Sequence, residues 1–107
     1  MKGFVYLLCN AETDSYKIGV TTGTIEKRIH QLQTGNDCKI HLVAFYKSDN
    51  PFTIEKMLHR KFFGKRKLNE WYNLEGDDIF KFEKICENLE NIISSLGDNP
   101  FYGKHLK

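Results

Sequence analysis

The amino-acid sequence predicts a small α+β domain: a three-stranded antiparallel sheet flanked by helices, with a long C-terminal helix. Two apolar runs of strand length, 3–9 and 16–21, are separated by a segment dense in turn-forming residues. Apolar residues recur at helical spacing in three later segments. A chain of 107 residues, of which 40% are hydrophobic, has enough apolar material for one core. We therefore expect a single domain.

The two apolar runs are expected to form an antiparallel hairpin. Its paired positions should add to an odd number, because this register gathers apolar residues of both runs on one core face, namely Val5, Leu7, Ile18 and Val20. In that register Tyr6 and Lys17 share the opposite face. Phe4 and Leu8 also lie there, so the opposite face is not expected to be fully solvated.

A helix and a third strand are expected after the hairpin. Thr24 is suited to cap a helix that ends near Gly35. Arg28 borders its apolar stripe, which consists of Ile25, Ile29 and Leu32. Residues 39–46 alternate in the manner of a strand, with His41 and Val43 on one side and an apolar side made of Ile40, Leu42, Ala44 and Tyr46.

Two further helices complete the predicted domain. The first has Asn50 as its cap and Pro51 at its first position, and it turns inward Ile54, Met57, Leu58 and Phe62. Glu55 and His59, four residues apart, share a face beside that stripe. The second helix spans 77–96 and buries Ile79, Phe82, Ile85, Leu89, Ile92 and Ile93. The domain is expected to cover 3–96, and 97–107 to form a loose tail.

Composition excludes several classes of protein. The longest apolar stretches are far shorter than the roughly 20 residues that span a bilayer, and no signal peptide opens the chain. We expect no membrane partner and a location in the cytoplasm, or in the nucleus of a eukaryote. Cys9, Cys38 and Cys86 are an odd number without Cys-x-x-Cys spacing, so they are expected to be reduced, mostly buried thiols rather than disulfide or zinc ligands.

The formal net charge of +2 does not by itself indicate a nucleic-acid partner. The charges are unevenly distributed, however: 75–90 is rich in acid, whereas 56–67 is crowded with Lys and Arg. A local basic surface is what phosphate binding requires. We expect DNA to contact Lys56, Arg60, Lys65 and Arg66, although a solvated face rich in lysine would give the same pattern.

Four residues occur in a distinctive order. Tyr6 ends the string Phe4-Val5-Tyr6, Lys17 begins Lys17-Ile18-Gly19, Arg28 lies on the first helix and Glu55 on the second, and the first three are each eleven residues apart. From Phe4 to about Tyr72 this order resembles the GIY-YIG nuclease superfamily. The Lys-Ile-Gly variant, the string from Gln31 to Asn36 and the string Glu70-Trp71-Tyr72 resemble its small phage-type branch. The resemblance implies a metal-dependent endonuclease that hydrolyses DNA.

The chemistry of phosphodiester hydrolysis suits these residue types. Attack on phosphorus needs a base, a cation for the developing phosphate charge and oxygen ligands for a metal. Tyr6 is the candidate for accepting a proton from the attacking water or positioning it, and Lys17 for stabilising the phenolate or the phosphate. Arg28 would clamp two phosphate oxygens. Glu55 would hold one Mg²⁺ or Mn²⁺, with His59 as a further polar group in catalysis. We expect Tyr6, Lys17, Arg28 and Glu55 to converge in one shallow groove, on the sheet face away from the long C-terminal helix.

Several positions depart from the superfamily pattern. Lys17 stands where a tyrosine is usual, and Leu32 where a His or Tyr is common, so His59 or His30 is expected to compensate. Asn69 stands where a Gly often precedes Glu-Trp, and the late Asn of other members corresponds to Asn69 or Asn73. Trp71 and Tyr72 are interpreted as core closure rather than base stacking, and His41 as structural.

Two other functions fit the same residues. Each of the four, taken singly, is also compatible with a core residue or a surface charge. The departures at Lys17 and Leu32 favour a catalytically inactive nucleic-acid-binding module derived from the nuclease, and a basic helix can also bind an acidic protein. Target sequence, strand preference, pathway and oligomeric state do not follow from the sequence. Without an appended DNA-binding domain, specificity is expected to be low, or to come from a separate protein or a homodimer.

Overall fold

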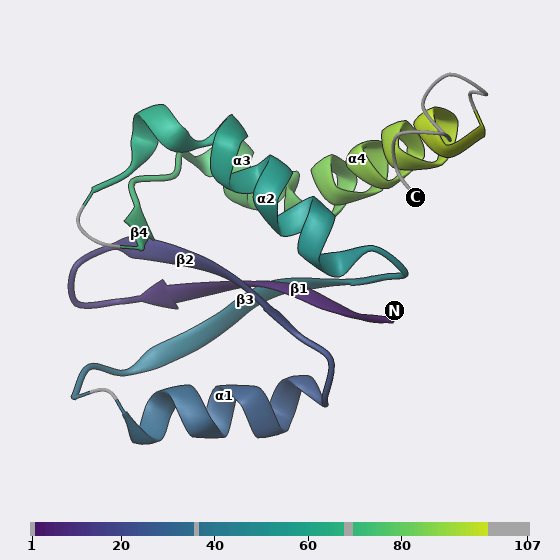
Figure 1. The fold of residues 1–107 in the computed structure, drawn as a ribbon. Coiled ribbons are helices and arrows are strands. Elements are labelled where there is room, and N and C mark those ends of the chain that lie inside the picture. Colours follow the sequence, from purple (N-terminus) through teal and green to yellow (C-terminus); the bar gives the residue numbers. More distant parts are fainter. Residues whose placement is uncertain (1, 36, 68–69, 99–107) are drawn as a thin grey trace.

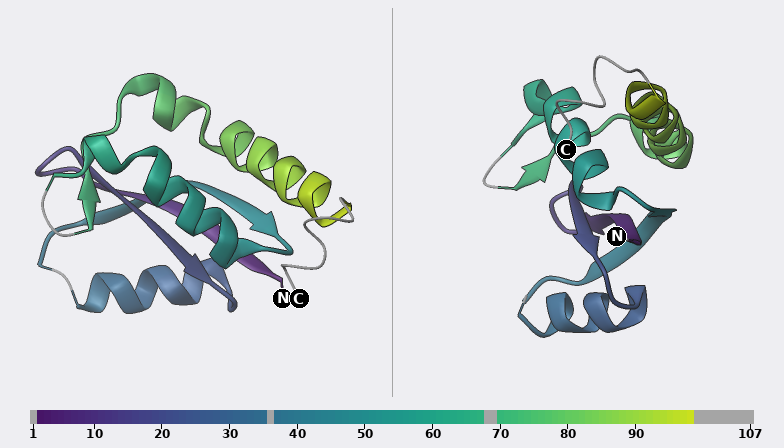
Figure 2. Two further views of the ribbon diagram at one scale, coloured as in Figure 1. Left: turned by 45° about the horizontal axis from the view of Figure 1, so that its top comes forward. Right: turned by 45° about the vertical axis from the view of Figure 1, so that its right-hand side comes forward.

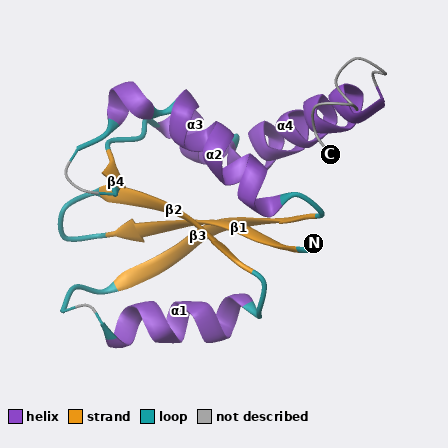
Figure 3. Ribbon diagram, viewed as in Figure 1, coloured by secondary structure: helices purple, strands orange, loops and turns teal. Residues whose placement is uncertain are grey.

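The computed structural model describes residues 2–35, 37–67 and 70–98 and confirms the α+β class (Figure 1). α1 covers one side of the sheet, and α2, α3 and α4 lie on the other (Figures 2 and 3). No helix within these ranges is long and apolar enough to cross a membrane. The elements in chain order are β1 Gly3–Asn10, β2 Ser15–Thr21, α1 Ile25–Thr34, β3 Ile40–Ser48, α2 Pro51–Lys61, η1 Phe63–Lys65, β4 Trp71–Tyr72, α3 Gly76–Phe80 and α4 Phe82–Asp98.

The predicted hairpin register is confirmed. β1 and β2 are antiparallel, Leu7 pairs with Ile18, and Leu8 pairs with Lys17, so paired positions add to an odd number. Tyr6 pairs with Gly19 in the same register. Residues that pair directly share a sheet face, as do residues two apart. Tyr6 and Lys17 therefore share the face covered by α1, away from α4.

A fourth strand extends the sheet beyond the predicted three. The strand order is β3-β1-β2-β4, and β4 pairs antiparallel with Tyr16 and Lys17 at one end of β2. β4 contains only Trp71 and Tyr72, which is too short to show a period of two in the sequence. Its backbone is held by the turn before it, since the amide of Lys67 donates to the carbonyl of Trp71 at 2.8 Å.

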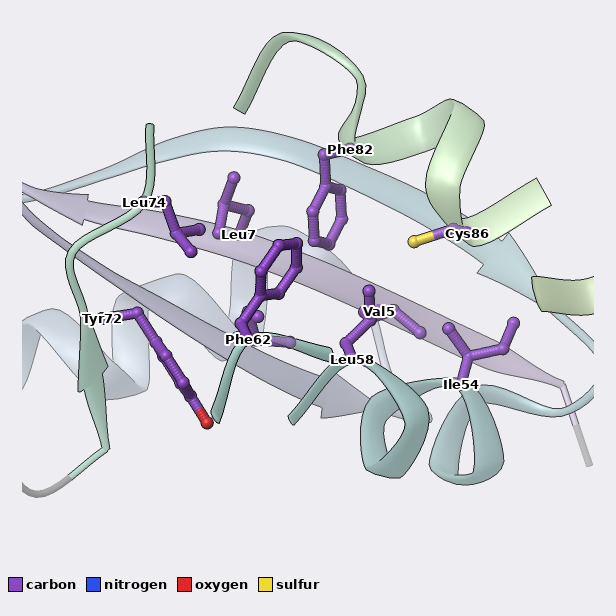
Figure 4. Close-up of a cluster of buried hydrophobic side chains, with 10 residues drawn as sticks. Val5, Leu7, Ile54, Leu58, Phe62, Tyr72, Leu74, Phe82 and Cys86 are labelled. Carbon is purple, nitrogen blue, oxygen red and sulfur yellow. The ribbon is translucent and has the colours of Figure 1, made fainter. Parts of the chain in front are cut away.

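The sheet separates two apolar layers of unequal size. The larger layer lies beneath α2 and α4, and Figure 4 shows its side chains converging from both helices and from β1 and β4. Its buried members are Val5, Leu7, Ile18, Ile54, Leu58, Phe62, Tyr72, Leu74, Phe82 and Cys86. The smaller layer lies under α1, with Tyr6, Leu8, Ile25 and Ile40 buried and Phe4, Ile29 and Leu32 packed beside them.

The third strand differs from the prediction because its alternation is interrupted. Leu8 pairs with Leu42 but Leu7 pairs with Ala44, so Val43 is an extra residue in β3. Such a bulge reverses the side-chain alternation. Ile40 consequently belongs to the α1 layer, whereas Ala44 packs against the α2 and α4 layer. The single apolar side expected for this strand is therefore wrong, and its exposed apolar residues are Leu42, Val43 and Phe45.

The long predicted C-terminal helix is two helices: α3 ends at Phe80, and Lys81, whose φ is −99° and ψ is 12°, separates it from α4. Apolar spacing continues through this point, so periodicity gives no sign of the interruption. Phe82 is fully buried as predicted, but Ile92 is 47% exposed and does not belong to the buried side. The predicted tail lies outside the described residues, apart from its first two positions in α4.

The start of α2 and the cysteines agree in part with the predictions. Asn50 and Pro51 occupy the predicted cap and first position, but the side-chain Nδ2 of Asn50 donates to a carboxylate oxygen of Glu90 at 3.0 Å, and the side chain makes no capping hydrogen bond. All three cysteines are free, and only Cys86 is fully buried.

Candidate active site

Tyr6 lies in the middle of β1 and is 1% exposed. A Cβ placed on its pairing partner Gly19 would lie 2.4 Å from the Tyr6 hydroxyl oxygen and 2.5 Å from the ring carbon that carries it. Real Cβ atoms do not approach other atoms so closely, so the phenol ring must lie directly over Gly19. The hydroxyl group therefore extends across β2, and the Gly of the Lys-Ile-Gly string is required by this ring.

Arg28 meets the same hydroxyl group from α1. Its Nε atom donates a hydrogen bond to the Tyr6 hydroxyl oxygen at 3.2 Å. α1 is fixed at its start by Thr24, whose side chain accepts from the amide of Lys27 at 3.3 Å. A guanidinium group carries five N–H donors in a planar fork, so it can hold a phenol oxygen and still reach a phosphate. The structure thus brings together two of the predicted catalytic residues.

Lys17 lies near the β2 end that pairs with β4. Its Nζ atom is 2.9 Å from an Oε2 of Glu70, the residue directly before β4. The hydrogen bond and the positive charge of Lys17 lower the pKa of the Glu70 carboxyl group. Glu70 was not among the predicted site residues. The sequence shows that Glu70 precedes Trp71 and Tyr72, but it does not predict that β4 pairs with the strand segment that contains Lys17.

Glu55 and His59 form a second group on α2. The Nδ1 atom of His59 and the hydroxyl oxygen of Tyr72 are 2.5 Å apart and share a hydrogen bond, and Nε2 lies 3.9 Å from a carboxylate oxygen of Glu55. Burial raises the pKa of Glu55, and the negative charge of Glu70 adds to this effect, while His59 opposes it. Because Tyr72 lies in β4, this group sits on the β2 and β4 side of α2.

The predicted residues do not all lie on one face of the sheet. Tyr6, Lys17 and Arg28 are on the α1 side, as expected, whereas α2 packs on the other side through Ile54. A single groove on the face away from α4 is therefore wrong. The Lys17–Glu70 pair relates the two sides, since Lys17 shares the sheet face of Tyr6 and Glu70 is close enough to act on the charge of Glu55.

The predicted DNA-binding residues differ in their surroundings. Lys56 and Arg60 are exposed one turn apart on α2, and Arg66 is exposed after η1. Lys65 is engaged within the protein, since its Nζ atom lies 2.5 Å from a carboxylate oxygen of Asp78 and 3.9 Å from one of Glu75. The hydrogen bond that Lys65 donates to Asp78 raises the pKa of Lys65. Lys65 therefore contributes less free positive charge than the sequence implied.

The remaining candidates lie apart from these groups or outside the described residues. His30 and His41 are exposed on α1 and β3. Asn73 is exposed, and its backbone amide donates to the carbonyl of Lys65 at 2.7 Å. Asn69 is not among the described residues. Tyr72 is buried and closes the core, in agreement with its interpretation, and its hydroxyl group adds the hydrogen bond to His59.

The donor set available for a metal ion is small. Within the described ranges, no group of three or more His, Cys, Asp or Glu side chains is arranged to hold one. Glu55 offers a half-buried carboxylate with a raised pKa, and a divalent cation would relieve the cost of its buried charge. The residues present thus fit an ion that is bound by one carboxylate and takes its other ligands from water and substrate.

Comparison with known proteins places the chain within a family. The model of the T5orf172 domain matches residues 3–92, which include every residue of both groups. This chain belongs to the T5orf172 domain family. T5orf172 domains are phage-associated and nuclease-like in general. No curated protein and no solved structure matches the chain significantly.

Proposed function

We propose that this T5orf172 domain is a DNA endonuclease of the GIY-YIG type that hydrolyses phosphodiester bonds with Mg²⁺ or Mn²⁺. The observation that carries the proposal is the Tyr6 hydroxyl group, which lies over Gly19 and accepts a hydrogen bond from Arg28. The ring of Tyr6 packs in the α1 layer, but that packing does not require the hydroxyl group, which lies over Gly19 and beside a permanent cation. A hydroxyl group held in this way is suited to meet a negatively charged, reacting group.

Tyr6 and Arg28 would act on the attacking water and the phosphate. A positioned hydroxyl group can take or relay the proton of a water molecule as it attacks phosphorus. The guanidinium group of Arg28 holds the Tyr6 hydroxyl group in place through its hydrogen bond and would bind the phosphate oxygens as their charge grows. Both effects need the short, fixed contact between the two side chains.

Glu55 would hold the metal ion, and His59 would act beside it. The ion supplies a positive charge that stabilises the phosphoryl oxygens. The hydrogen bond between Tyr72 and Nδ1 fixes the ring of His59 so that Nε2 points toward Glu55, where it can orient the carboxylate or a water molecule. In the free protein Lys17 forms an ion pair with Glu70. Lys17 would leave this ion pair to bind a phosphate oxygen.

The test is to compare wild type with Glu55→Gln on supercoiled plasmid DNA. Gln keeps the size and hydrogen-bonding capacity of Glu but removes the charge that attracts the cation. Metal stabilisation of phosphoryl charge is worth several kcal/mol, so cleavage should fall roughly a hundredfold or more. Glu83→Gln, an exposed acid on α4, is the matched control and should cleave as wild type does. Equal cleavage by the Glu55→Gln variant would remove Glu55 as the metal ligand.

The alternative is a catalytically inactive DNA-binding module. It is favoured by one observation: Lys17, which replaces the usual tyrosine, is already paired with Glu70. Binding by the basic residues should weaken with salt, by a slope of about 0.9 in log affinity against log salt for each phosphate neutralised. DNA binding of this kind without cleavage under any divalent metal would favour the module. Target specificity would come from a separate protein or a second copy.

A further inference from the structure

Phe63 is an exposed aromatic residue with no role in the core. α2 ends at Lys61, and the next residue, Phe62, is 2% exposed and packs in the larger layer. The chain then tightens into η1, where the amide of Arg66 donates to the carbonyl of Phe63 at 3.2 Å. This turn directs Phe63 outward, and it is 69% exposed.

Phe63 forms part of a pocket beside the candidate active site. The pocket has a volume of about 240 Å³ and is lined by His59, Phe63, Arg66, Glu70 and Tyr72. It combines an aromatic wall with a guanidinium group, an imidazole and a carboxylate. A planar heterocycle that carries hydrogen-bonding groups on its edge matches these walls, because its ring can stack on Phe63 while its edge meets the polar side chains.

The pocket adjoins both groups of the candidate site. Glu70 lines it and is bonded to Lys17, and His59 lines it and stands beside Glu55. The pocket is accompanied by cations: Arg66 lines it, and the exposed Arg60 and Lys61 follow the lining residue His59 on α2. A chain of phosphates that passes the active site would therefore carry its neighbouring bases over this pocket.

Exposure of an aromatic side chain is not sufficient for this interpretation. Phe80 on α3 is 92% exposed, more than Phe63. Among the described residues, the pocket at Phe80 is lined by a carboxylate, Glu83, and by no cation, however, whereas Arg66 lines the pocket at Phe63. A polyanion such as DNA is therefore better matched to the pocket at Phe63.

We propose that Phe63 stacks on an unpaired base of DNA beside the scissile phosphate, with Arg66 contacting the same nucleotide. The domain then takes single-stranded or locally unpaired DNA in preference to regular duplex, in which every base face is already stacked. The position of this base relative to the cut rests on the proposed nuclease function, but the stacking itself does not.

The experiment measures binding of oligonucleotides that contain 2-aminopurine, whose fluorescence falls on stacking, in the absence of divalent metal. Wild type should quench the single-stranded probe. Phe63→Ala should abolish the quenching and weaken single-strand binding by about tenfold, while duplex binding changes by less than about twofold because it depends on the cations. Phe80→Ala is the matched control and should behave as wild type, and Phe63→Tyr should retain the quenching. Circular dichroism checks that each variant is folded.

The outcomes separate this proposal from the proposed function. Four results would each overturn the stacking role. These are quenching that is unchanged in Phe63→Ala, a loss of duplex binding equal to the loss of single-strand binding, binding of RNA but not of DNA, and no binding by wild type. Plasmid cleavage that persists when stacking is absent leaves the nuclease intact. Stacking that depends on Phe63 without cleavage under any metal leaves the stacking site intact and removes the nuclease.

Discussion

The two faces of the sheet each bury a tyrosine whose hydroxyl group is bonded to a side chain of the covering helix. On the α1 face Tyr6 meets Arg28 at 3.2 Å, and on the α2 face Tyr72 meets His59 at 2.5 Å. The surroundings differ. Tyr72 belongs to the larger apolar layer, whereas Tyr6 occupies the centre of a smaller layer that is closed by one helix.

This difference indicates which residues contribute mainly to folding and which contribute mainly to cleavage. The larger layer fixes the sheet, and α2 holds Glu55 and His59 at its margin. In the smaller layer the polar side chain of Tyr6 takes a central place that an apolar residue could fill. Its ring fits there because Gly19 has no side chain. We therefore expect substitutions in the larger layer to affect mainly folding, and those around Tyr6 to affect mainly cleavage.

The largest expected effect compares Leu7→Ala with Leu8→Ala. Both side chains are fully buried, on opposite faces of β1. Leu→Ala in a core costs roughly 2–5 kcal/mol. The loss of stability for Leu7→Ala should lie at the upper end of this range, because several elements surround the side chain. The loss for Leu8→Ala should lie at the lower end, because α1 alone covers that side chain and can move toward the cavity. Urea unfolding measures both, and an equal or reversed order would contradict the division between the layers.

The second comparison is between Tyr6→Phe and Tyr72→Phe. Both keep the ring and remove only the hydroxyl group, so both should fold. Tyr6→Phe should lower cleavage by roughly a hundredfold, the lower end of the range for a positioned acid or base. Tyr72→Phe releases only the orientation of His59 and should lower cleavage by about tenfold. Single-turnover cleavage rates give both values, and a greater loss in Tyr72→Phe would exchange the roles of the two faces.

A smaller effect is expected for Gly19→Ala. The added methyl group must displace the Tyr6 ring, because it would lie 2.4 Å from the hydroxyl oxygen. Overpacking of this kind costs about 1–3 kcal/mol, and cleavage should fall together with stability. Gly76→Ala, where nothing lies within 4 Å of the added atom, is the control and should change neither. Wild-type cleavage by Gly19→Ala would show that the position of the Tyr6 ring is unimportant.

The smallest effect concerns Asp78, which holds Lys65 at the rim of the larger layer. Burial alone would raise the pKa of Asp78, but hydrogen bonds from Lys65 and from the backbone amide of Glu75 bring it below its usual value. The contribution of a carboxylate with a lowered pKa is present above its unfolded pKa and is lost as pH falls through the folded one. Asp78→Asn should therefore reduce stability at neutral pH by less than about 1 kcal/mol.

Thermal unfolding at neutral and acid pH tests this prediction. The difference between Asp78→Asn and wild type should disappear once the pH is below the lowered pKa of Asp78. A difference that persists in acid would mean that shape, not charge, is responsible.

Sequence patterns predicted the parts of this molecule that depend on local spacing. The hairpin register followed from alternation, and the start of α1 from Thr24. Features that depend on tertiary pairing were not visible. Two residues of β4 cannot show a period, yet their pairing with β2 brings Glu70 to Lys17. The bulge at Val43 likewise reverses an alternation that the sequence carries unchanged.

The candidate site shows the same limit. The order of Tyr6, Lys17 and Arg28 gave their common side of the sheet, because register and helix stripe decide it. The side on which Glu55 lies depends on where α2 crosses the sheet, and a helix with one apolar stripe packs equally well on either face. Glu55 was consequently expected on the wrong side.

The bulge in β3 also bears on how the domain behaves at high concentration. β3 is an edge strand with three exposed apolar residues, the kind of edge that recruits strands from other molecules into aggregates. Val43 divides its nine residues into two shorter regular stretches, paired with Gly3–Leu7 and with Leu8–Asn10. A neighbouring molecule cannot extend the sheet along both stretches in one register. The bulge thus hinders aggregation through this edge strand. We expect a variant that deletes Val43 to lose solubility before it loses its fold.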